Sequence, residues 1–428
     1  MKKSLIALAA VAAVGAASAQ SSVTLYGVLD AAYNNLSSTN AGSVSRLTGN
    51  GSNQSSRLGF RGVEDLGGGL KASFVLEAAI NVDNGAGTST TANNNIVGQS
   101  ATTGSGATLA GNASSSANGQ QGLTFNRRST VSLSGGFGEV RIGRDLTPTF
   151  MNLTVYDPFG TVGVGASTNV SLGTLNPIGV SVAPPGSPKA TVRASNSITY
   201  FTPNLGGFSA SAMYSFAEVP SNCTAFGTAT GAQGNSCAGA SGDGKYFGAR
   251  GGYNNGPISA SIAFAKNTFA NNATAASAGL TGTAFRGDGT IFNLGGSYNF
   301  GPATAMVQYG TMKQQANLNQ AVATDQKLTH YLLGVSVPVG AGEFKASYNW
   351  GKLDKVAAAA ENDRNQRQLA LGYVYNMSKR TALYTTYARM TANGLGATAS
   401  MGLTSTAVTA ASGAASATGY DIGIRHSF

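Results

Sequence analysis

The stretch GLTFNRRSTVSLSGGFGEVRIGRDLTPTFMNLTVYDPFGTVGVG, residues 122–165, reads as two strands joined by a tight turn and followed by a long polar connection. The first strand alternates polar and apolar residues after the paired Arg127 and Arg128, and the second carries Arg141. Such alternation predicts strands whose two faces meet different environments. The connection, which we place at 146–193, is too polar to lie in lipid. We therefore expect it to fold into the space that the strands enclose.

The N-terminus and the composition narrow the class of protein. A basic start, an apolar run over 5–17 and the A-x-A pattern at 17–19 predict a signal peptide over residues 1–19. No later window approaches the roughly 18–20 apolar residues that a membrane-spanning helix needs. Glycine accounts for 59 of 428 residues, and charged residues make up 10%, against about 25% in ordinary soluble domains. These values favour a single β-rich domain over residues 20–428 with many tight turns.

Period-two alternation recurs along the whole chain, and its connections alternate between short and long. Seven short connections and eight long ones divide the chain into sixteen strands. The short ones lie at 64–69, 135–138, 204–207, 255–257, 301–302, 340–342 and 376–379; the long ones lie at 34–54, 83–122, 146–193, 219–244, 268–288, 316–326, 354–366 and 392–416. An even number of antiparallel strands with short turns at one rim and long loops at the other is typical of an outer-membrane β-barrel.

Physical reasoning supports closure of the sheet into a barrel. No backbone group can stay unpaired in a bilayer, so a spanning sheet has to close. The alternative is a secreted β-sandwich or adhesin, but its strands would need a second apolar layer where this sequence has Arg, Glu, Asn and Gln. Sixteen strands enclose an aqueous channel, whereas eight-stranded barrels fill with side chains. The all-β fold that we expect is thus a transmembrane barrel with a water-filled lumen.

Charge, cysteines and histidines exclude several other functions. The net charge of +10 includes Lys2 and Lys3 of the expected signal peptide, which leaves +8, and the chain has no Lys/Arg-rich run that would favour a nucleic-acid partner. Cys223 and Cys237 lie close together in sequence, where they could form one loop disulfide. We find no catalytic motif and no metal-ligand spacing. We therefore expect no enzyme activity, no metal and no cofactor.

Six motifs resemble the general porins of β-proteobacteria, and above all their anion-selective trimeric members. They are SVTLYG at 22–27, SRLGFRGVEDLGGGLKA at 56–72, RRSTVSLS at 127–134, FGEVRIGRD at 137–145, SKRTALY at 378–384 and GIRHSF at 423–428. The resemblance spans essentially the whole mature length. It implies a trimer of sixteen-stranded barrels in the outer membrane of a Gram-negative bacterium, with short periplasmic turns, long external loops and the third external loop folded into each lumen.

The resemblance also implies which residues form the pore constriction. It places the arginines at Arg57, Arg127 and Arg193, and the acidic partners at Glu77 and at Asp157 on the inserted loop. Strand alternation gives an independent prediction for some of them. With Leu58 and Leu76 facing lipid, the side chains of Arg57 and Glu77 face the lumen; further candidates for the lumen wall are Arg61 and Arg141.

For the paired arginines, alternation and resemblance disagree. If Val131 and Leu133 face lipid, Arg128 faces inward and Arg127 outward, whereas the resemblance selects Arg127. Either a bulge near Thr130 shifts the register, or the assignment is displaced by one residue, because one extra residue moves every later side chain to the other face. We keep both arginines as candidates.

These observations predict a passive diffusion pore with a preference for anions. A guanidinium stays charged at physiological pH and is weakly hydrated, so it can contact a passing anion and release it. The alternative function is a surface or adhesion barrel whose loops act instead of its lumen. We expect a homotrimer that contacts outer-membrane lipids and lipopolysaccharide and passes small anionic or neutral solutes. The terminal Phe428 resembles the signal that the β-barrel assembly machinery reads.

Overall fold

The computed structural model describes residues 22–39, 42–88, 122–173, 191–217, 242, 244–271, 285–316, 324–354, 364–393 and 414–428. The expected signal peptide (1–19) and the two cysteines that could form a loop disulfide, Cys223 and Cys237, lie outside the described residues. Within the described residues, strands form nearly all of the regular structure, with one short α-helix and one π-helical turn in the connection after β6. In the described ranges no helix is long and apolar enough to cross a membrane.

The described residues contain seventeen strands, and every pairing between them is antiparallel within a single sheet. Their bounds are β1 Ser22–Ser38, β2 Gly42–Thr48, β3 Arg57–Gly67, β4 Leu70–Ala79, β5 Arg128–Gly135, β6 Gly138–Leu146, β7 Arg193–Phe201, β8 Phe208–Ser215, β9 Tyr246–Asn255, β10 Ile258–Asn271, β11 Phe285–Asn299, β12 Thr304–Ala316, β13 Thr324–Val339, β14 Gly342–Leu353, β15 Arg364–Asn376, β16 Thr381–Asn393 and β17 Ala414–Ser427. The helical elements are α2, Pro148–Val155, and η1, Asn169–Gly173.

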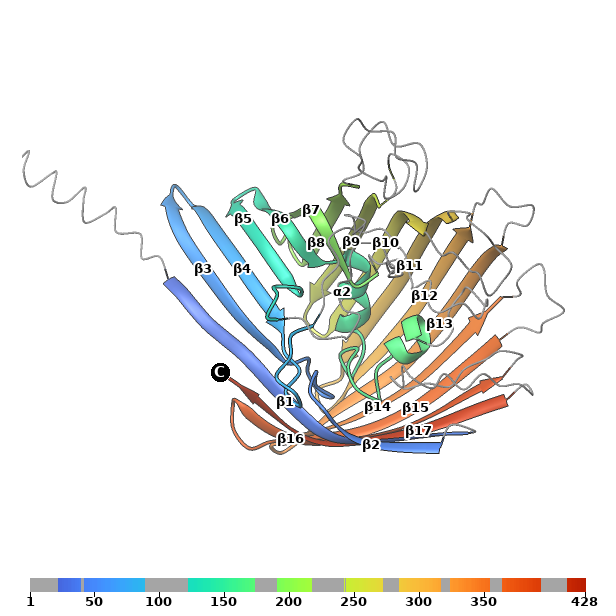
Figure 1. Ribbon diagram of the computed structural model, residues 1–428. Coiled ribbons are helices and arrows are strands. Elements are labelled where there is room, and N and C mark those ends of the chain that lie inside the picture. The colour runs from blue at the N-terminus through green and yellow to red at the C-terminus, as the bar shows by residue number, and fades with distance from the viewer. Residues whose placement is uncertain are drawn as a thin grey trace, which may run out of the picture.

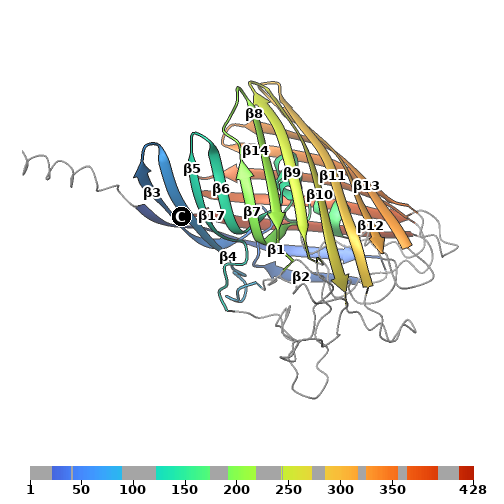
Figure 2. The ribbon, with the colours of Figure 1, turned by 90° about the horizontal axis from the view of Figure 1, so that it is seen from above.

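The sheet closes into a ring of sixteen strands, as the sequence predicts. From β3 onward each strand pairs with the next, and β1 pairs with both β3 and β17. The last residue seals this seam, because the Phe428 amide donates to the Gly27 carbonyl and the Gly27 amide to the Phe428 carbonyl, each at 3.1 Å. Figure 1 shows the ring with α2 inside it, and Figure 2 shows strands β8 to β13 side by side in one wall.

The remaining strand, β2, lies in a segment that we expected to be a loop. We expected a loop over 34–54, but β1 continues to Ser38 and β2 folds back on its upper half, with Ala32 opposite Thr48 and Ser38 opposite Gly42. The chain then leaves the sheet over 49–56 before β3 begins. The buried Asp30 carboxylate stabilises this segment, since it accepts hydrogen bonds from the backbone amides of Ser52, Asn53 and Gln54 at 3.4, 3.0 and 2.6 Å.

Along the strands, successive side chains point alternately to the outer face and to the lumen, as expected. On β16, Leu383 and Tyr387 are 43% and 45% exposed on the outer face, whereas Ala388 and Met390, on the lumen side, are fully buried. The residues on the lumen side are buried because they pack against the inserted connection rather than against a second sheet. An apolar exterior and an interior filled in part by a loop fit a barrel that stands in lipid.

Candidate pore constriction

The inserted loop, for which the structure describes residues 146–173, leaves β6 at Leu146 and returns to β7 at Arg193. Its neck is pinned at Thr147, whose amide donates to the Val192 carbonyl at 3.1 Å and whose hydroxyl donates to the Thr191 carbonyl at 2.8 Å. Thr147 also caps α2 by accepting the Phe150 amide, and a proline follows it in the first turn. The capping threonine and the proline therefore make α2 begin at the neck of the inserted loop.

A buried polar network fastens α2 to the wall formed by β9 to β12. The Asn152 amide donates to Asn293 Oδ1 at 2.8 Å, and Arg250 Nε donates to Asn152 Oδ1 at 3.1 Å. The side-chain amides of Asn293 and Gln308 donate to the carbonyls of Thr149 and Leu153 at 3.0 and 2.7 Å. Inward-facing amides thus satisfy the helix backbone in a place where an apolar wall would leave its polar groups unpaired.

Beyond α2, the loop packs its large side chains over glycines of the wall. A Cβ atom built on any of three glycines would lie under 3.0 Å from a loop side chain, which is closer than real Cβ contacts come. Tyr156 lies over Gly295 of β11, Pro158 over Gly334 of β13 and Phe159 over Gly372 of β15. A Cβ atom added to these glycines would lie 2.1, 2.5 and 2.8 Å, respectively, from the loop side chain. These glycines leave the room in which the loop lies against the wall.

Asp157 is not where we expected it. Its side chain is 4% exposed inside the loop, and its carboxylate accepts the amides of Phe159, Thr161 and Ser167 at 2.9, 3.1 and 2.8 Å. Burial raises the pKa of this carboxyl, and the hydrogen bonds from Ser167, Phe159 and Thr161 oppose that rise. Asp157 organises the loop's own turn instead of facing the arginines across open water, because its neighbours in sequence offer it three amides at short range.

The end of this turn is tethered to the seam of the barrel. The amide of Val164 donates to Asp421 Oδ2 at 3.3 Å, and Asn34 Nδ2 donates to the other oxygen of that carboxylate at 2.5 Å. Asp421 belongs to β17 and Asn34 to β1. The inserted loop therefore runs along the wall from β9 to the closing strands.

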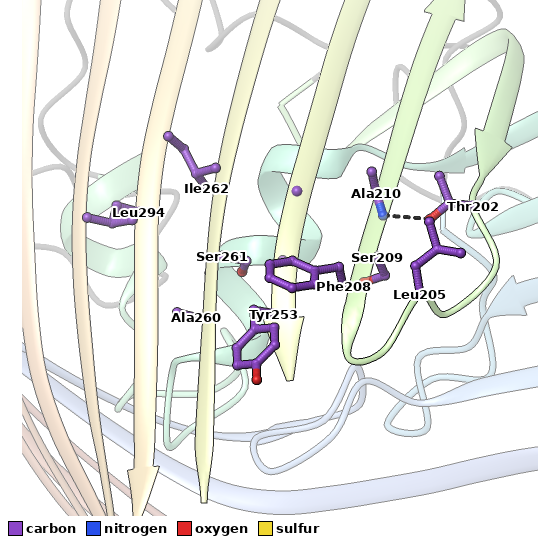
Figure 3. Close-up of a pocket in the computed structure, with 12 residues that line it drawn as sticks. Thr202, Leu205, Phe208, Ser209, Ala210, Tyr253, Ala260, Ser261, Ile262 and Leu294 are labelled. Atoms are coloured by element: carbon purple, nitrogen blue, oxygen red, sulfur yellow. Dashed lines mark hydrogen bonds between the residues drawn. The ribbon is translucent and has the colours of Figure 1, made fainter. Parts of the chain in front are cut away.

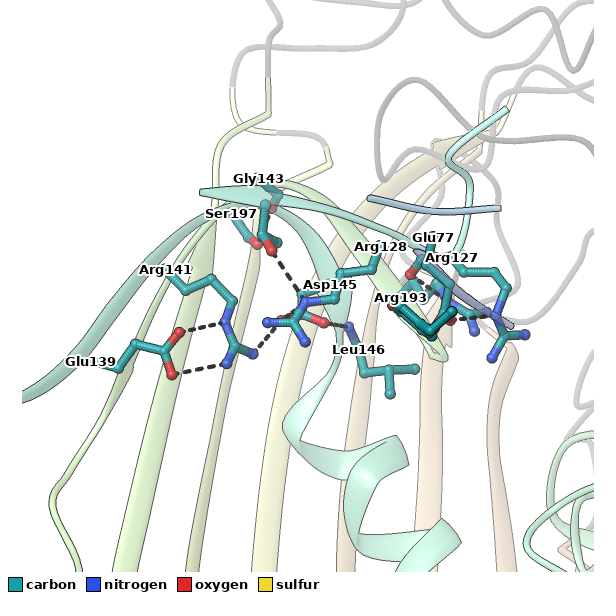
Figure 4. Close-up of polar contacts among 12 residues, drawn as sticks. Glu77, Arg127, Arg128, Glu139, Arg141, Gly143, Asp145, Leu146, Arg193 and Ser197 are labelled. Atoms are coloured by element: carbon teal, nitrogen blue, oxygen red, sulfur yellow. Dashed lines mark hydrogen bonds and ion pairs between the residues drawn. The ribbon is translucent and has the colours of Figure 1, made fainter. Parts of the chain in front are cut away.

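The sequence-predicted arginines gather on the wall at the loop's neck, where Glu77 of β4 holds the first group. Its carboxylate pairs with Arg127 Nε at 2.6 Å and with Arg57 Nε at 3.4 Å, and it accepts the Tyr26 hydroxyl at 3.2 Å. Arg193 Nε donates to the Arg127 carbonyl at 2.8 Å. Figure 4 shows Arg127, Glu77 and Arg193 together. Four of the expected constriction residues thus lie in one cluster, with Arg57 contributed by β3.

A second group continues along β5 and β6. Arg141 pairs with Glu139 at 3.0 Å and with Asp145 at 2.6 Å, and Arg128 lies 3.7 Å from Asp145 (Figure 4). The Arg128 Nε also donates to the Thr130 hydroxyl at 3.1 Å. The strand register places Arg128 directly opposite Glu77, which joins the two groups.

The structure resolves the disagreement over the paired arginines without a bulge in β5. Val131 and Leu133 are exposed on the outer face, so alternation turns Arg128 inward as predicted. The strand begins at Arg128, and Arg127 precedes it. The alternation rule therefore does not govern Arg127, and its backbone amide bonds to the Glu77 carbonyl at 3.0 Å while its side chain reaches the Glu77 carboxylate. Both arginines reach the same cluster.

We call this set the arginine wall. It consists of Arg57, Arg127, Arg128, Arg141 and Arg193 with the carboxylates of Glu77, Glu139 and Asp145. Five guanidinium groups less three carboxylates leave a surplus of two positive charges. The carboxylates fix the guanidinium groups in place, because charge-assisted pairs are short and directional. A fixed positive surplus attracts anions without forming a closed pocket that would retain them.

Two other predicted residues have simpler surroundings. Arg61 is exposed on β3, and its guanidinium carbon lies 5.4 Å from the centre of the Tyr26 ring. Phe428 is 41% exposed, and its ring lies so close to Gly27 that a Cβ there would be 2.3 Å from it. In the described part of the chain, no three His, Cys, Asp or Glu residues are grouped so that they could hold a metal ion.

Sequence reasoning missed several residues of this site. Glu139 and Asp145 complete the arginine wall, Arg250 anchors α2, and Asp30 and Asp421 hold the segment 49–56 and the loop. All of these residues except Asp145 could have been found by the signal that located Glu77, namely a charged side chain on the lumen side of an alternating strand. Asp145 is an exception, because a register shift between Gly143 and Asp145 breaks the alternation just before it.

A closed strand barrel with an apolar exterior, a loop inside and a charged lumen wall defines a pore-forming membrane protein. The family model of the Gram-negative porins matches residues 5–395, and the chain belongs to that family. It is a protein of the Gram-negative outer membrane.

The chain is also similar to individual porins. Outer membrane porin protein 32 of Delftia acidovorans is 39% identical over 433 residues, with 100% of both chains covered. An outer membrane porin protein of Bordetella pertussis is 26% identical over 413 residues, which cover 90% of this chain and 93% of that one. The solved anion-selective porin from Comamonas acidovorans has a TM-score of 0.68 at 35% identity and covers 96% of this chain and 100% of its own. The trimer form of OmpT of Vibrio cholerae, at 16% identity and a TM-score of 0.57, shares the fold, with 95% of this chain and 99% of that one covered.

Proposed function

We propose that this porin is a general diffusion channel that prefers anions and passes small anionic or neutral solutes. The observation that carries the proposal is the surplus of two positive charges on the arginine wall beside the inserted loop. Low-dielectric barrel walls focus the field of such charges into the lumen. The solved relative that is 35% identical to this chain is an anion-selective porin, and that selectivity supports the same assignment.

Within this proposal the arginine wall and the inserted loop have different roles. Arg57, Arg127, Arg128 and Arg193, with Glu77, set the charge of the constriction, and Arg61 and Arg141 extend the charged path. Asp157 acts indirectly, through the shape of the loop that it organises. No step of transport requires a bound cofactor or a chemical reaction, because solutes cross by diffusion.

Planar-bilayer recording of the purified full-length protein tests the proposal. We expect stepwise conductance and, in a KCl gradient, a reversal potential of the sign that anion preference gives. The double variant Arg57→Ser/Arg193→Ser should lose anion preference, most strongly at low salt. Lys379→Ser removes one positive charge at an exposed turn and should leave the reversal potential unchanged. Absence of stepwise channels would favour the alternative of a surface barrel that acts through its loops, and cation preference in the unmodified protein would refute the anion assignment.

We further propose that the chain assembles as a homotrimer and that the assembly machinery reads its C-terminal strand. The trimer form of the structurally similar OmpT supports the first point by analogy of fold. Light scattering of the protein in detergent would yield three times the mass of one chain if the first point holds, and the mass of one chain would contradict it.

A further inference from the structure

A second segment lies on the lumen side of the barrel wall, beside the inserted loop. It is the stretch between β2 and β3, residues 49–56, which we call the strap. Asp30 of β1 is fully buried on the lumen side, and its carboxylate accepts three successive backbone amides of the strap at 3.4, 3.0 and 2.6 Å. The Ser56 hydroxyl also donates to the Asp30 carbonyl and accepts the Asp30 amide, each at 3.0 Å. Asp30 therefore holds the strap against the inner face of the barrel.

A buried tyrosine fixes the Asp30 carboxylate from two strands away. The hydroxyl of Tyr384, on β16, donates to Asp30 Oδ1, and the tyrosine side chain is itself buried. The Tyr384 side chain crosses β17 at Gly423, where a Cβ atom would lie 2.4 Å from the hydroxyl oxygen. A hydrogen bond to a carboxylate oxygen is among the stronger ones in proteins. Tyr384 therefore orients the carboxylate that in turn holds the strap.

The strap lies against the turn of the inserted loop, residues 157–167, which we call the loop turn. Gly163 of this turn has φ +76°, and a Cβ atom on it would lie 2.1 Å from the Ser52 carbonyl oxygen. The next residue, Val164, is 2% exposed and belongs to an apolar cluster against which Val44 of β2 packs. The strap and β2 therefore contact the loop turn on the side of β1.

The strap also borders the arginine wall. The Ser55 carbonyl accepts Arg57 Nη1 at 3.2 Å, and the Gly49 carbonyl accepts the amide of Val82, in the segment after β4, at 3.0 Å. Arg57 has a separate ion pair with Glu77 that does not involve the strap. The strap thus stands between the loop turn and the arginine wall, which are the two parts that border the proposed pore.

Other contacts hold the rest of the inserted loop without the strap. Under α2, the Ser261 hydroxyl bonds to Asn152 Oδ1. Figure 3 shows this part of the wall at an outer groove that Ile262 lines, with Ser261 next to the helix behind the strands. On the side of β15, Gln368 Nε2 donates to the Ala166 carbonyl of the loop turn at 3.1 Å. Without the strap, the loop turn would therefore keep its contacts with β13 to β15 and lose its support on the side of β1.

We propose that Asp30 and Tyr384 are positioning residues of the pore, which act through the strap to keep the loop turn against the barrel wall. The inference rests on the proposed diffusion channel, for which it names the groups that keep the constriction open. Once the strap is released, the loop turn is held on one side only, and its movement into the lumen narrows the channel. The arginine wall keeps its charge throughout, because Glu77 still pairs with Arg57.

Two variants release the strap from its two ends. Tyr384→Phe removes the hydroxyl that orients Asp30, and Gly163→Ala puts a Cβ atom 2.1 Å from the Ser52 carbonyl oxygen. Each has a matched control in its own element. Tyr387→Phe removes a hydroxyl on the outer face of β16, and Gly160→Ala adds a Cβ at φ +60° in the loop turn, where it meets nothing within 4 Å.

Labelling of a cysteine in the loop turn measures how often the turn opens. Val164→Cys is the reporter in a full-length chain that carries Cys223→Ser/Cys237→Ser, since a thiol reagent reaches this buried position only in the open turn. We expect Tyr384→Phe to label roughly tenfold faster than the reporter alone, which is the factor that the loss of one strong hydrogen bond gives. Gly163→Ala should behave likewise, and both controls should label at the reporter's rate. The double variant should label about as fast as the faster single one, because both changes break the same contact.

Planar-bilayer recording connects the strap to the pore. Without the reporter cysteine, Tyr384→Phe and Gly163→Ala should each spend roughly tenfold more time in partly closed levels, with an unchanged reversal potential. Unchanged labelling in both variants, or equally fast labelling in either control, would overturn the role of the strap. Faster labelling without more closing events would overturn its link to the pore, and normal open channels in that case would leave the proposed function intact. Absence of any channel in the unmodified protein would refute the proposed function instead, while the labelling rates would still test the strap.

Discussion

The substitution Glu77→Gln changes the charge of the arginine wall by one unit while keeping the shape of the side chain. Glu77 is 16% exposed and pairs with Arg57 and Arg127. With five guanidinium groups and three carboxylates the surplus is two, and removal of one carboxylate raises it to three. A glutamine still accepts hydrogen bonds from both arginines, so we expect them to stay in place. Anion preference should therefore increase.

The size of the increase follows from Coulomb's law. One unit charge about 8 Å from a permeating ion in water changes its energy by about 0.5 kcal/mol before screening. At about 0.1 M salt, where the Debye length is about 10 Å, about 0.2 kcal/mol remains, with opposite sign for anion and cation. The anion-to-cation permeability ratio should then rise about twofold. At about 10 mM the same arithmetic gives about fourfold, and at about 1 M almost no change.

Reversal potentials in KCl gradients at these three salt levels measure the effect. Arg127→Gln should shift the ratio by a similar factor in the opposite direction, and the double variant Glu77→Gln/Arg127→Gln should return it close to the starting value, because the net charge is restored. A Glu77→Gln channel whose ratio stays unchanged at low salt would refute the assignment of the arginine wall to the conducting path. A shift that does not depend on salt would refute its electrostatic cause.

Three further outcomes test the loop and the seam. Gly295→Ala would place a Cβ atom 2.1 Å from the Tyr156 ring, and such overpacking costs about 1–3 kcal/mol of stability. We expect the single-channel current of this variant to be lower and noisier. The control Gly296→Ala, whose Cβ would have its nearest neighbours at 3.6 and 3.7 Å, should leave the current unchanged. Asp157→Ala leaves three loop amides without their acceptor, so limited proteolysis should cut the loop faster while the barrel stays resistant to heat; unchanged cleavage would contradict its organising role. Phe428→Leu keeps both backbone hydrogen bonds of the seam, so refolding in detergent should be unaffected while assembly in cells falls; normal assembly in cells would show that the aromatic ring is not read.

Much of the barrel could be predicted from the sequence because its environment is simple. Lipid outside and water inside impose a two-residue period on every strand, and that period located the faces of β3, β4 and β5 correctly. It failed where the chain leaves the regular strand, as at Arg127, one residue before β5 begins. Pairing between strands also leaves no mark in the local sequence. The strand β2 was missed because its partner in the sheet is the second half of β1, residues 32–38.

The site was harder to predict because charge alone does not reveal which partner a side chain will meet. Asp157 is a carboxylate on the inserted loop, which is where a lumen acid is expected, yet its side chain turns into the loop and accepts three amides there. The glycines under the loop gave no sign of their role, because glycine is common throughout this chain. Only the register of the strands shows that Gly295, Gly334 and Gly372 stand in line beneath the loop.

In the proposed pore, the inserted loop and the arginine wall are separate parts of the structure. The inserted loop rests on β9 to β15 through wall glycines and buried amides, and we propose that it limits the width. The arginine wall belongs to β3 to β7 and holds itself in place through its own carboxylates. A change such as Glu77→Gln should therefore alter selectivity at constant conductance in high salt, and Gly295→Ala should alter conductance at constant selectivity. Variants that changed both quantities together would mean that the loop and the arginine wall are coupled through the neck at Thr147.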